Sequence, residues 1–210
     1  MGYDLLVKNG TVIDGSGSPG YRADVGVVDG KIAAIGRINE SAKRTIDADG
    51  HIVSPGFVDG HTHMDAQIFW DPIGSCSCYH GVTSVVMGNC GFTLAPCKQE
   101  DADMVFRNLE RAEDLSRDAM LEGIDWRWET FPEFLDVIDE LPKGINYAGY
   151  IGHSALRTYV MGERAFSDAA SEDDVRNMQG LVKQAVQAGA IGFSTSRTCL
   201  LYTSDAADEV

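Results

Sequence analysis

The chain has 210 residues, 44% of them hydrophobic, and a formal net charge of −15 at pH 7. This length can bury one sizeable core, but no apolar run approaches the roughly 18 residues that a membrane span requires. The first residues lack the order of a secretory signal, so we expect a cytoplasmic protein, and the acidic excess argues against nucleic acid or an anionic membrane as partner. Five cysteines, an odd number, favour thiols or metal ligands over a disulfide framework.

The first fifty residues are typical of a small β meander. Short apolar runs flank Asn9-Gly10 and Asp29-Gly30, and both dipeptides are typical of two-residue hairpin turns because they tolerate positive φ. A further turn signal at 47–50 ends this block. We therefore predict a β unit over residues 1–50.

From residue 51 onward, strand-like and helix-like segments alternate. Apolar positions between Asp103 and Leu121 fall at helical spacing, Thr130 and Glu133 form a capping box, and Ser171 begins the clearest amphipathic helix. Such alternation predicts an α/β fold with a parallel sheet. The four expected strands are 52–58, 83–89, 146–152 and 190–195.

Two histidines, His61 and His63, follow the first of these strands in the segment SPGFVDGHTHMD. Side chains alternate along extended chain, so both imidazoles point to the same side, where two neutral imidazoles can share a zinc ion. The alternative is a pair of ordinary surface histidines. Their place after a buried strand favours a site, because α/β folds keep their chemistry at the C-terminal ends of parallel strands. Asp65, two residues further on, is a candidate for orienting an imidazole.

Cys90 follows the second expected strand in VVMGNCGFTLAP. The adjacent glycines allow a sharp turn that would present a thiolate at the same rim as the histidines. A small buried hydrophobe is the alternative, and the position alone leaves both open. A second zinc group is conceivable at Cys76, Cys78, His80 and Cys97, but these residues lack the paired Cys-x-x-Cys spacing of zinc knuckles, and we do not favour it.

Four longer segments carry a family resemblance: VSPGFVDGHTHMDAQ, HGVTSVVMGNCGFTLAP, YIGHSALRTYVMG and GAIGFSTSRT. Together they closely resemble the N-terminal part of the D-aminoacylase (N-acyl-D-amino-acid deacylase) branch of the amidohydrolase superfamily. The resemblance implies a (β/α)8 TIM-type barrel beside a small β-sandwich. Residues 1–50 would then be the N-terminal part of the sandwich, and residues 51–198 the first half of the barrel, with about four of eight strands.

The resemblance also implies a site. His61 and His63 match the ligands of a more exposed, weaker metal position, and Cys90 matches a zinc ligand that bridges when both positions are filled. His153 matches a position near the active-site rim, where a structural hydrogen-bonding role is equally consistent. The implied cofactor is Zn²⁺ at one tight site and a second weaker one. The implied substrate is a small N-acyl amino acid whose amide bond is hydrolysed.

Two alternatives remain. One is a cyclic-amide hydrolase of the dihydropyrimidinase or hydantoinase type; its relatives use a lysine where this chain has AIGFSTSRT, so the missing lysine and the presence of Cys90 favour the deacylase. The other is a non-catalytic, metal-binding half-barrel.

The family's general base and two further histidine ligands come from later strands. We therefore expect no catalytic residue within this chain and an inactive fragment. We also expect residues 199–210, CLLYTSDAADEV, to be a non-native tail, because they depart abruptly from the family pattern.

Overall fold

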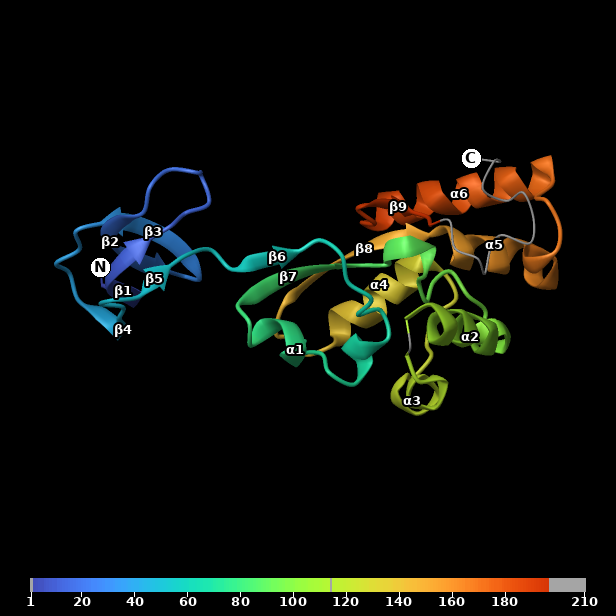
Figure 1. The fold of residues 1–210 in the computed structure, drawn as a ribbon, viewed down its shortest axis with the longest axis horizontal. Coiled ribbons are helices and arrows are strands. Elements are labelled where there is room, and N and C mark those ends of the chain that lie inside the picture. Colours follow the sequence, from blue (N-terminus) through green and yellow to red (C-terminus); the bar gives the residue numbers. More distant parts are fainter. Residues whose placement is uncertain (1, 114, 197–210) are drawn as a thin grey trace. The chain divides into compact units, whose positions relative to one another are not determined.

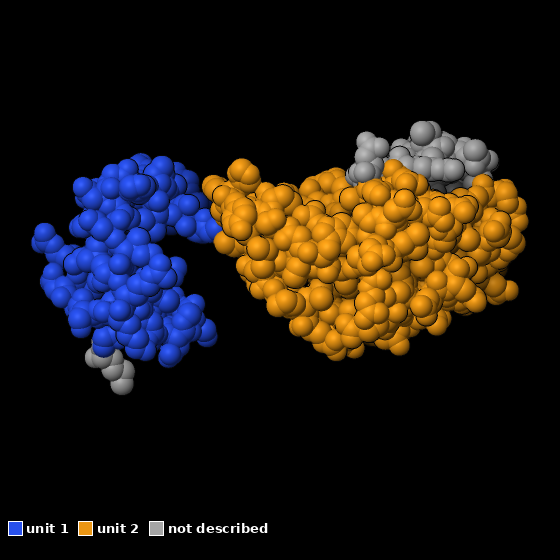
Figure 2. Space-filling model, turned by 90° about the horizontal axis from the view of Figure 1, so that it is seen from below, with its two compact units in different colours: residues 1–56 blue, residues 57–210 orange. Residues whose placement is uncertain are grey.

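A computed structural model describes residues 2–113 and 115–196 of the chain. The chain forms two compact units, Met1–Gly56 and Phe57–Val210, which are coloured separately in Figure 2. Residues 51–56 therefore group with the N-terminal unit, although the sequence assigns them to the barrel half. The expected non-native tail, 199–210, lies outside the described residues.

The N-terminal unit is a five-stranded sheet (Figure 1). Strand β1 pairs with β2, β4 and β5, and β3 lies outside β2. The β1–β2 and β2–β3 pairs are antiparallel, whereas β4 and β5 run parallel to β1. The bounds are β1 Tyr3–Val12, β2 Tyr21–Val28, β3 Lys31–Gly36, β4 Ala42–Asp47 and β5 Ile52–Val53.

The two predicted hairpin turns have different outcomes. Asp29 and Gly30 join β2 to β3 with φ of 50° and 73°, which confirms that hairpin. The Asn9-Gly10 prediction is wrong, because β1 continues through both residues and its register shifts between Val7 and Gly10. Asn9 takes its positive φ of 62° inside this bulge, where its amide donates to Asp24. The same backbone preference thus serves a bulge instead of a turn.

The second unit holds four parallel strands in the order β6-β7-β8-β9 (Figure 1). This confirms the parallel half-barrel sheet. The predicted strand 52–58 is wrong as one element, because Ile52 and Val53 pair with β1 and a new strand begins only after Pro55-Gly56. Proline has no N–H to donate to a ladder, so it separates the two sheets. The strands are β6 Phe57–Asp59, β7 Val82–Met87, β8 Asn146–Gly152 and β9 Gly192–Ser194.

Helices connect and cover these strands. The predicted capping box at Thr130 is present, and Ser171 caps its helix as predicted, there also as part of a capping box with Asp174. The helical spacing predicted between Asp103 and Leu121 belongs to two helices, and Ser116 caps the second by accepting a hydrogen bond from the Ala119 amide. The helices are α1 Ser75–Cys78, α2 Ala102–Glu113, α3 Arg117–Gly123, α4 Phe131–Glu140, α5 His153–Met161 and α6 Glu172–Ala188. Within the described ranges, none is long and apolar enough to cross a bilayer.

The main core lies between this sheet and its helices. Ile151 of β8 and Phe134 of α4 are almost fully buried in it. Trp128 stacks on Trp126 at 4.4 Å and on Phe69 at 5.1 Å between ring centroids. These aromatic side chains therefore serve packing.

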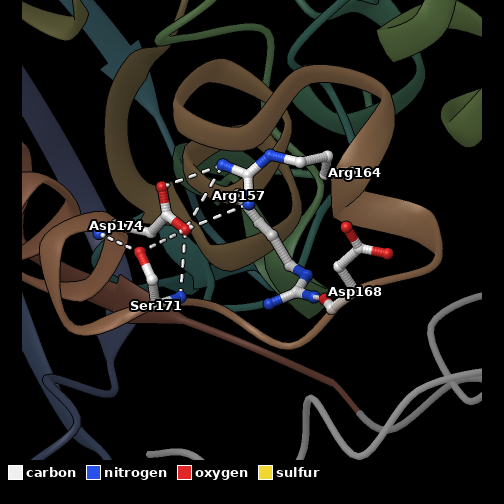
Figure 3. A network of polar contacts seen from close by, with 5 residues as sticks. All are labelled: Arg157, Arg164, Asp168, Ser171 and Asp174. Atoms are coloured by element: carbon white, nitrogen blue, oxygen red, sulfur yellow. Dashed lines mark hydrogen bonds and ion pairs between the residues drawn. The ribbon is translucent and has the colours of Figure 1, made fainter.

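A polar network joins the end of α5 to the start of α6 (Figure 3). The buried Arg157 donates from Nε to the Ala165 carbonyl at 2.9 Å and from Nη2 to the Asp168 carbonyl. Arg164 pairs with Asp174 at 3.1 Å, and Asp174 also accepts from Ser171. The connection between the two helices is thus fixed by charged hydrogen bonds.

Candidate metal centre

The loop after β6 presents the two histidines. Thr62, between them, points inward and donates to the Val86 carbonyl from both its amide (2.9 Å) and its Oγ1 (2.8 Å). This pins the loop to the end of β7. His61 and His63 lie on either side of Thr62, with ring centroids 5.4 Å apart, and the His61 amide donates to Asp59.

Cys90 lies in a tight turn after β7, residues 88–91, called the Cys90 turn from here on. Gly88 and Gly91 have φ of 76° and 82°, and Cys90 itself has φ of 57°. Left-handed backbone is costly for a residue with a Cβ, by about 1–2 kcal/mol. Such strain is concentrated at functional sites, where surrounding structure enforces it.

The Cys90 turn and the histidine loop place three ligand atoms together. One ligand atom each from His61, His63 and Cys90 lies within 4.8 Å of the others, and His61 Nε2 is 3.4 Å from Cys90 Sγ. Zinc bonds of about 2.0 Å to nitrogen and 2.3 Å to sulfur, at tetrahedral angles, separate those two atoms by about 3.5 Å. The donor set and its spacing therefore fit zinc. Among the described residues this is the only such group.

Asp65 is almost fully buried and accepts a hydrogen bond from the Gly88 amide at 2.9 Å. The contact places its carboxylate behind the Cys90 turn. This hydrogen bond anchors the backbone that carries the thiol. The expectation that Asp65 also orients an imidazole stays a prediction.

His153 is buried at the first position of α5. Its Nδ1 lies 3.3 Å from Thr195 Oγ1, and its ring meets the edge of Phe193. Both contacts are with β9 and the residues after it, and His153 lies outside the metal-ligand group. The role of His153, at the active-site rim or in structural hydrogen bonding, stays a prediction.

Three residues of this site were missed from the sequence. Asn89 donates to the carbonyls of Thr62 and Val86, which ties the Cys90 turn to the histidine loop. Ser194, the last residue of β9, and Ser196, two residues later, form hydrogen bonds with the backbone of the Cys90 turn. The available signal was the hydroxyl-rich run FSTS at the C-terminal end of the strand expected over 190–195.

The second zinc group considered above does not assemble among the described residues. Cys97 is buried and its thiol donates to the Lys98 carbonyl. Burial, together with the negative charges of Asp101 and Glu129, raises the pKa of Cys97 to about 12. Cys97 is therefore a protonated core residue at neutral pH.

Comparisons with known proteins point to one family. A model of the amidohydrolase family matches residues 44–209. The D-aminoacylase of Alcaligenes xylosoxydans xylosoxydans is 39% identical over 194 residues, 92% of this chain and 37% of that protein. The D-hydantoinase of Ralstonia pickettii is 31% identical, over 90% of this chain and 38% of that protein.

Among solved structures, the N-acyl-D-glutamate deacylase of Bordetella bronchiseptica, complexed with zinc and a phosphonate inhibitor, superposes with a TM-score of 0.77 at 33% identity. The match covers 93% of this chain and 38% of that one. The chain thus spans somewhat over a third of the length of the proteins it matches.

Proposed function

The chain belongs to the amidohydrolase family, and we propose that it contributes the first ligands of a zinc site that hydrolyses N-acyl-D-amino acids. The observation that carries this proposal is the group formed by His61, His63 and Cys90, whose ligand atoms lie within 4.8 Å of one another. The histidine loop and the Cys90 turn converge at the C-terminal ends of β6 and β7, where such barrels hold their active sites.

Each of the three residues has a role set by its chemistry. A bound zinc ion would polarise the acyl carbonyl and lower the pKa of a water molecule toward neutrality. Cys90 would supply a thiolate, the ligand with a full negative charge, while His61 and His63 would supply neutral imidazole nitrogens. We propose one tight zinc position that includes Cys90 and a second, weaker one at the histidines.

Asp65 and His153 would act from outside the ligand group. Asp65 holds the Gly88 amide and hence the position of the Cys90 turn. His153 is held at the start of α5 beside Thr195, where it would shape the rim that the substrate meets. The general base and the remaining ligands would come from the part of the barrel that the described strands do not supply.

The substrate proposal rests on two observations. Identity to the D-aminoacylase, 39%, exceeds the 31% to the D-hydantoinase. In addition, the sequence from Ala190 to Thr198 has no lysine, while Cys90 is present in the ligand group. Both favour linear N-acyl-D-amino acids over cyclic amides.

The test uses the enzyme expressed from the gene that encodes the whole barrel. Its rates of hydrolysis are compared for N-acyl-D-amino acids, their L enantiomers and hydantoins. We expect hydrolysis of the D series that requires zinc and is lost in Cys90→Ala, with Cys76→Ala as the matched control on an exposed cysteine. Preferential hydrolysis of hydantoins would support the cyclic-amide alternative. Zinc binding without hydrolysis of any of these substrates would contradict the hydrolase proposal and support a non-catalytic metal-binding role.

A further inference from the structure

The backbone of the Cys90 turn forms hydrogen bonds with the loop after β6 and with residues at and just after the end of β9. The Gly88 amide donates to Asp65 at 2.9 Å. The Cys90 carbonyl accepts from Ser196 Oγ at 2.7 Å. These partners are far away in sequence, so the shape of the turn depends on strands that are distant along the chain.

Ser194 has a special place in this arrangement, because it bonds to both ends of the turn. Its hydroxyl donates to the Gly88 carbonyl, and its oxygen accepts from the Gly91 amide at 3.1 Å. A hydroxyl can do both at once, since it carries one donor hydrogen and two acceptor lone pairs. Alanine could make neither bond.

Close backbone packing removes the space in which the turn could relax. A Cβ placed on Gly152, just before α5, would lie 2.4 Å from the Gly91 carbonyl oxygen. A Cβ on Gly88 would lie 2.5 Å from the Tyr150 carbonyl oxygen. The turn is thus pressed against the end of β8 while Ser194 joins its two ends, with the left-handed Cys90 between them.

We propose that Ser194 is a positioning residue for Cys90: its hydroxyl joins Gly88 to Gly91, and so holds the thiol in the conformation that meets His61 and His63. The proposal rests on the proposed function in that it takes Cys90 as a metal ligand. It adds that β9, which contributes no ligand atom to the described group, determines whether the thiolate is presented. Groups that orient a metal ligand typically change metal affinity by about 10–100-fold when removed.

The test is a Co²⁺ titration of the 210-residue chain. Binding is monitored through the sulfur-to-cobalt charge-transfer absorption. Ser194→Ala is compared with wild type, with Ser194→Thr, which keeps the hydroxyl, and with Ser84→Ala. Ser84 is the matched control, because it lies on β7 of the same sheet and accepts a bond from Asn146. We expect Ser194→Ala to bind Co²⁺ at least about 10-fold more weakly with a diminished sulfur band, while both other variants behave as wild type. An unchanged affinity and band in Ser194→Ala would overturn the proposal.

Hydrogen exchange of the metal-free chain separates this proposal from the metal site itself. Ser194→Ala should exchange faster in residues 88–91 than Ser84→Ala does, because the Gly91 amide has lost its acceptor. If the wild-type chain shows no sulfur band at all, the proposal that Cys90 binds the metal is wrong, and hydrogen exchange alone tests the role of Ser194. Faster exchange of residues 88–91 in Ser194→Ala would then support the role of Ser194 in holding the turn. Unchanged exchange would contradict that role.

Discussion

At the scale of single residues, the site depends on one strained backbone conformation. Cys90 has a φ of 57°, in a region that glycine adopts readily and other residues do not. Its strain is enforced by hydrogen bonds between the backbone of the turn and the side chains of Asp65, Ser194 and Ser196. The metal-free chain therefore gives up stability at the residue that would hold the metal.

Cys90→Gly should stabilise the metal-free chain relative to Cys90→Ala by about 1 kcal/mol, because only glycine removes the left-handed strain. Both variants remove the thiol, so both should lose the sulfur-dependent part of metal binding. Urea unfolding of the two metal-free proteins measures the difference. Equal unfolding free energies would mean that the turn is not strained.

Asp65→Ala should lower the free energy of unfolding by about 1–3 kcal/mol, since it leaves the Gly88 amide without its acceptor next to the core. Asp65→Asn is the matched variant, because its side-chain oxygen can still accept from that amide. We expect denaturant unfolding to place Asp65→Asn closer to wild type. An equal loss of unfolding free energy in both variants would mean that the negative charge of Asp65, and not its hydrogen bond, stabilises the fold.

At the scale of elements, local sequence signals predicted those features whose determinants are local. The capping box at Thr130, the helix cap at Ser171 and the hairpin at Asp29-Gly30 needed only nearby residues, and the structure contains all three. Asn9-Gly10 became a bulge, because the partners of Asn9 are Asp24 and Asp47, distant in sequence.

Helix α5 shows the limit of periodicity. It is buried nearly all round, so it has no polar face to reveal a helical repeat. For the same reason its buried Arg157 could not be assigned from the pattern. The contacts of β9 with the Cys90 turn join residues more than 100 positions apart, and no local signal encodes them.

Ser171→Ala should destabilise the chain by about 1 kcal/mol, because Ser171 Oγ accepts from the Asp174 amide at the start of α6. Ser167→Ala is the control, since the exposed Ser167 donates its hydroxyl to the neighbouring Asp168 side chain and is the N-cap of no helix in the described part of the chain. Thermal unfolding followed by circular dichroism compares the two. An equal effect in both would mean that the cap does not stabilise α6.

Asp174 should make stability depend on acid pH. The hydrogen bond from Arg164, followed by those from Ser171, lowers the pKa of Asp174 to about 2 from its ordinary value of 3.8. The ionised form is therefore favoured in the folded state, and its contribution is complete above pH 3.8 and is lost as the pH falls toward 2. Denaturant unfolding at pH 6 and at pH 2.5 should show a smaller gap between wild type and Asp174→Asn at the lower pH. A gap independent of pH would contradict the ion pair in Figure 3.

At the scale of the whole molecule, the sheet of the second unit has apolar edges. Phe57 and Val58 on β6 are 62% and 68% exposed, and Ile191 beside β9 is 51% exposed. Unpaired edges of this kind promote association.

The aligned relatives are more than twice as long as this chain, and their matched segments correspond to 37–38% of their length.

For the site, as for the elements, local sequence signals predicted some features and tertiary contacts determined the others. The sequence identified His61, His63 and Cys90 as candidates from their positions after two strands, and the structure brings them together. The sequence could not show what holds them, because the supporting hydrogen bonds come from β9 and from Asp65, through the tertiary fold.

The most direct test of zinc ligation is X-ray absorption at the zinc edge of the zinc-loaded 210-residue chain, with Cys90→Ser as comparison. We predict one sulfur at about 2.3 Å together with nitrogen ligands at about 2.0 Å, and loss of the sulfur shell in Cys90→Ser. A wild-type spectrum with only nitrogen and oxygen neighbours, or a sulfur shell that persists in Cys90→Ser, would contradict the account.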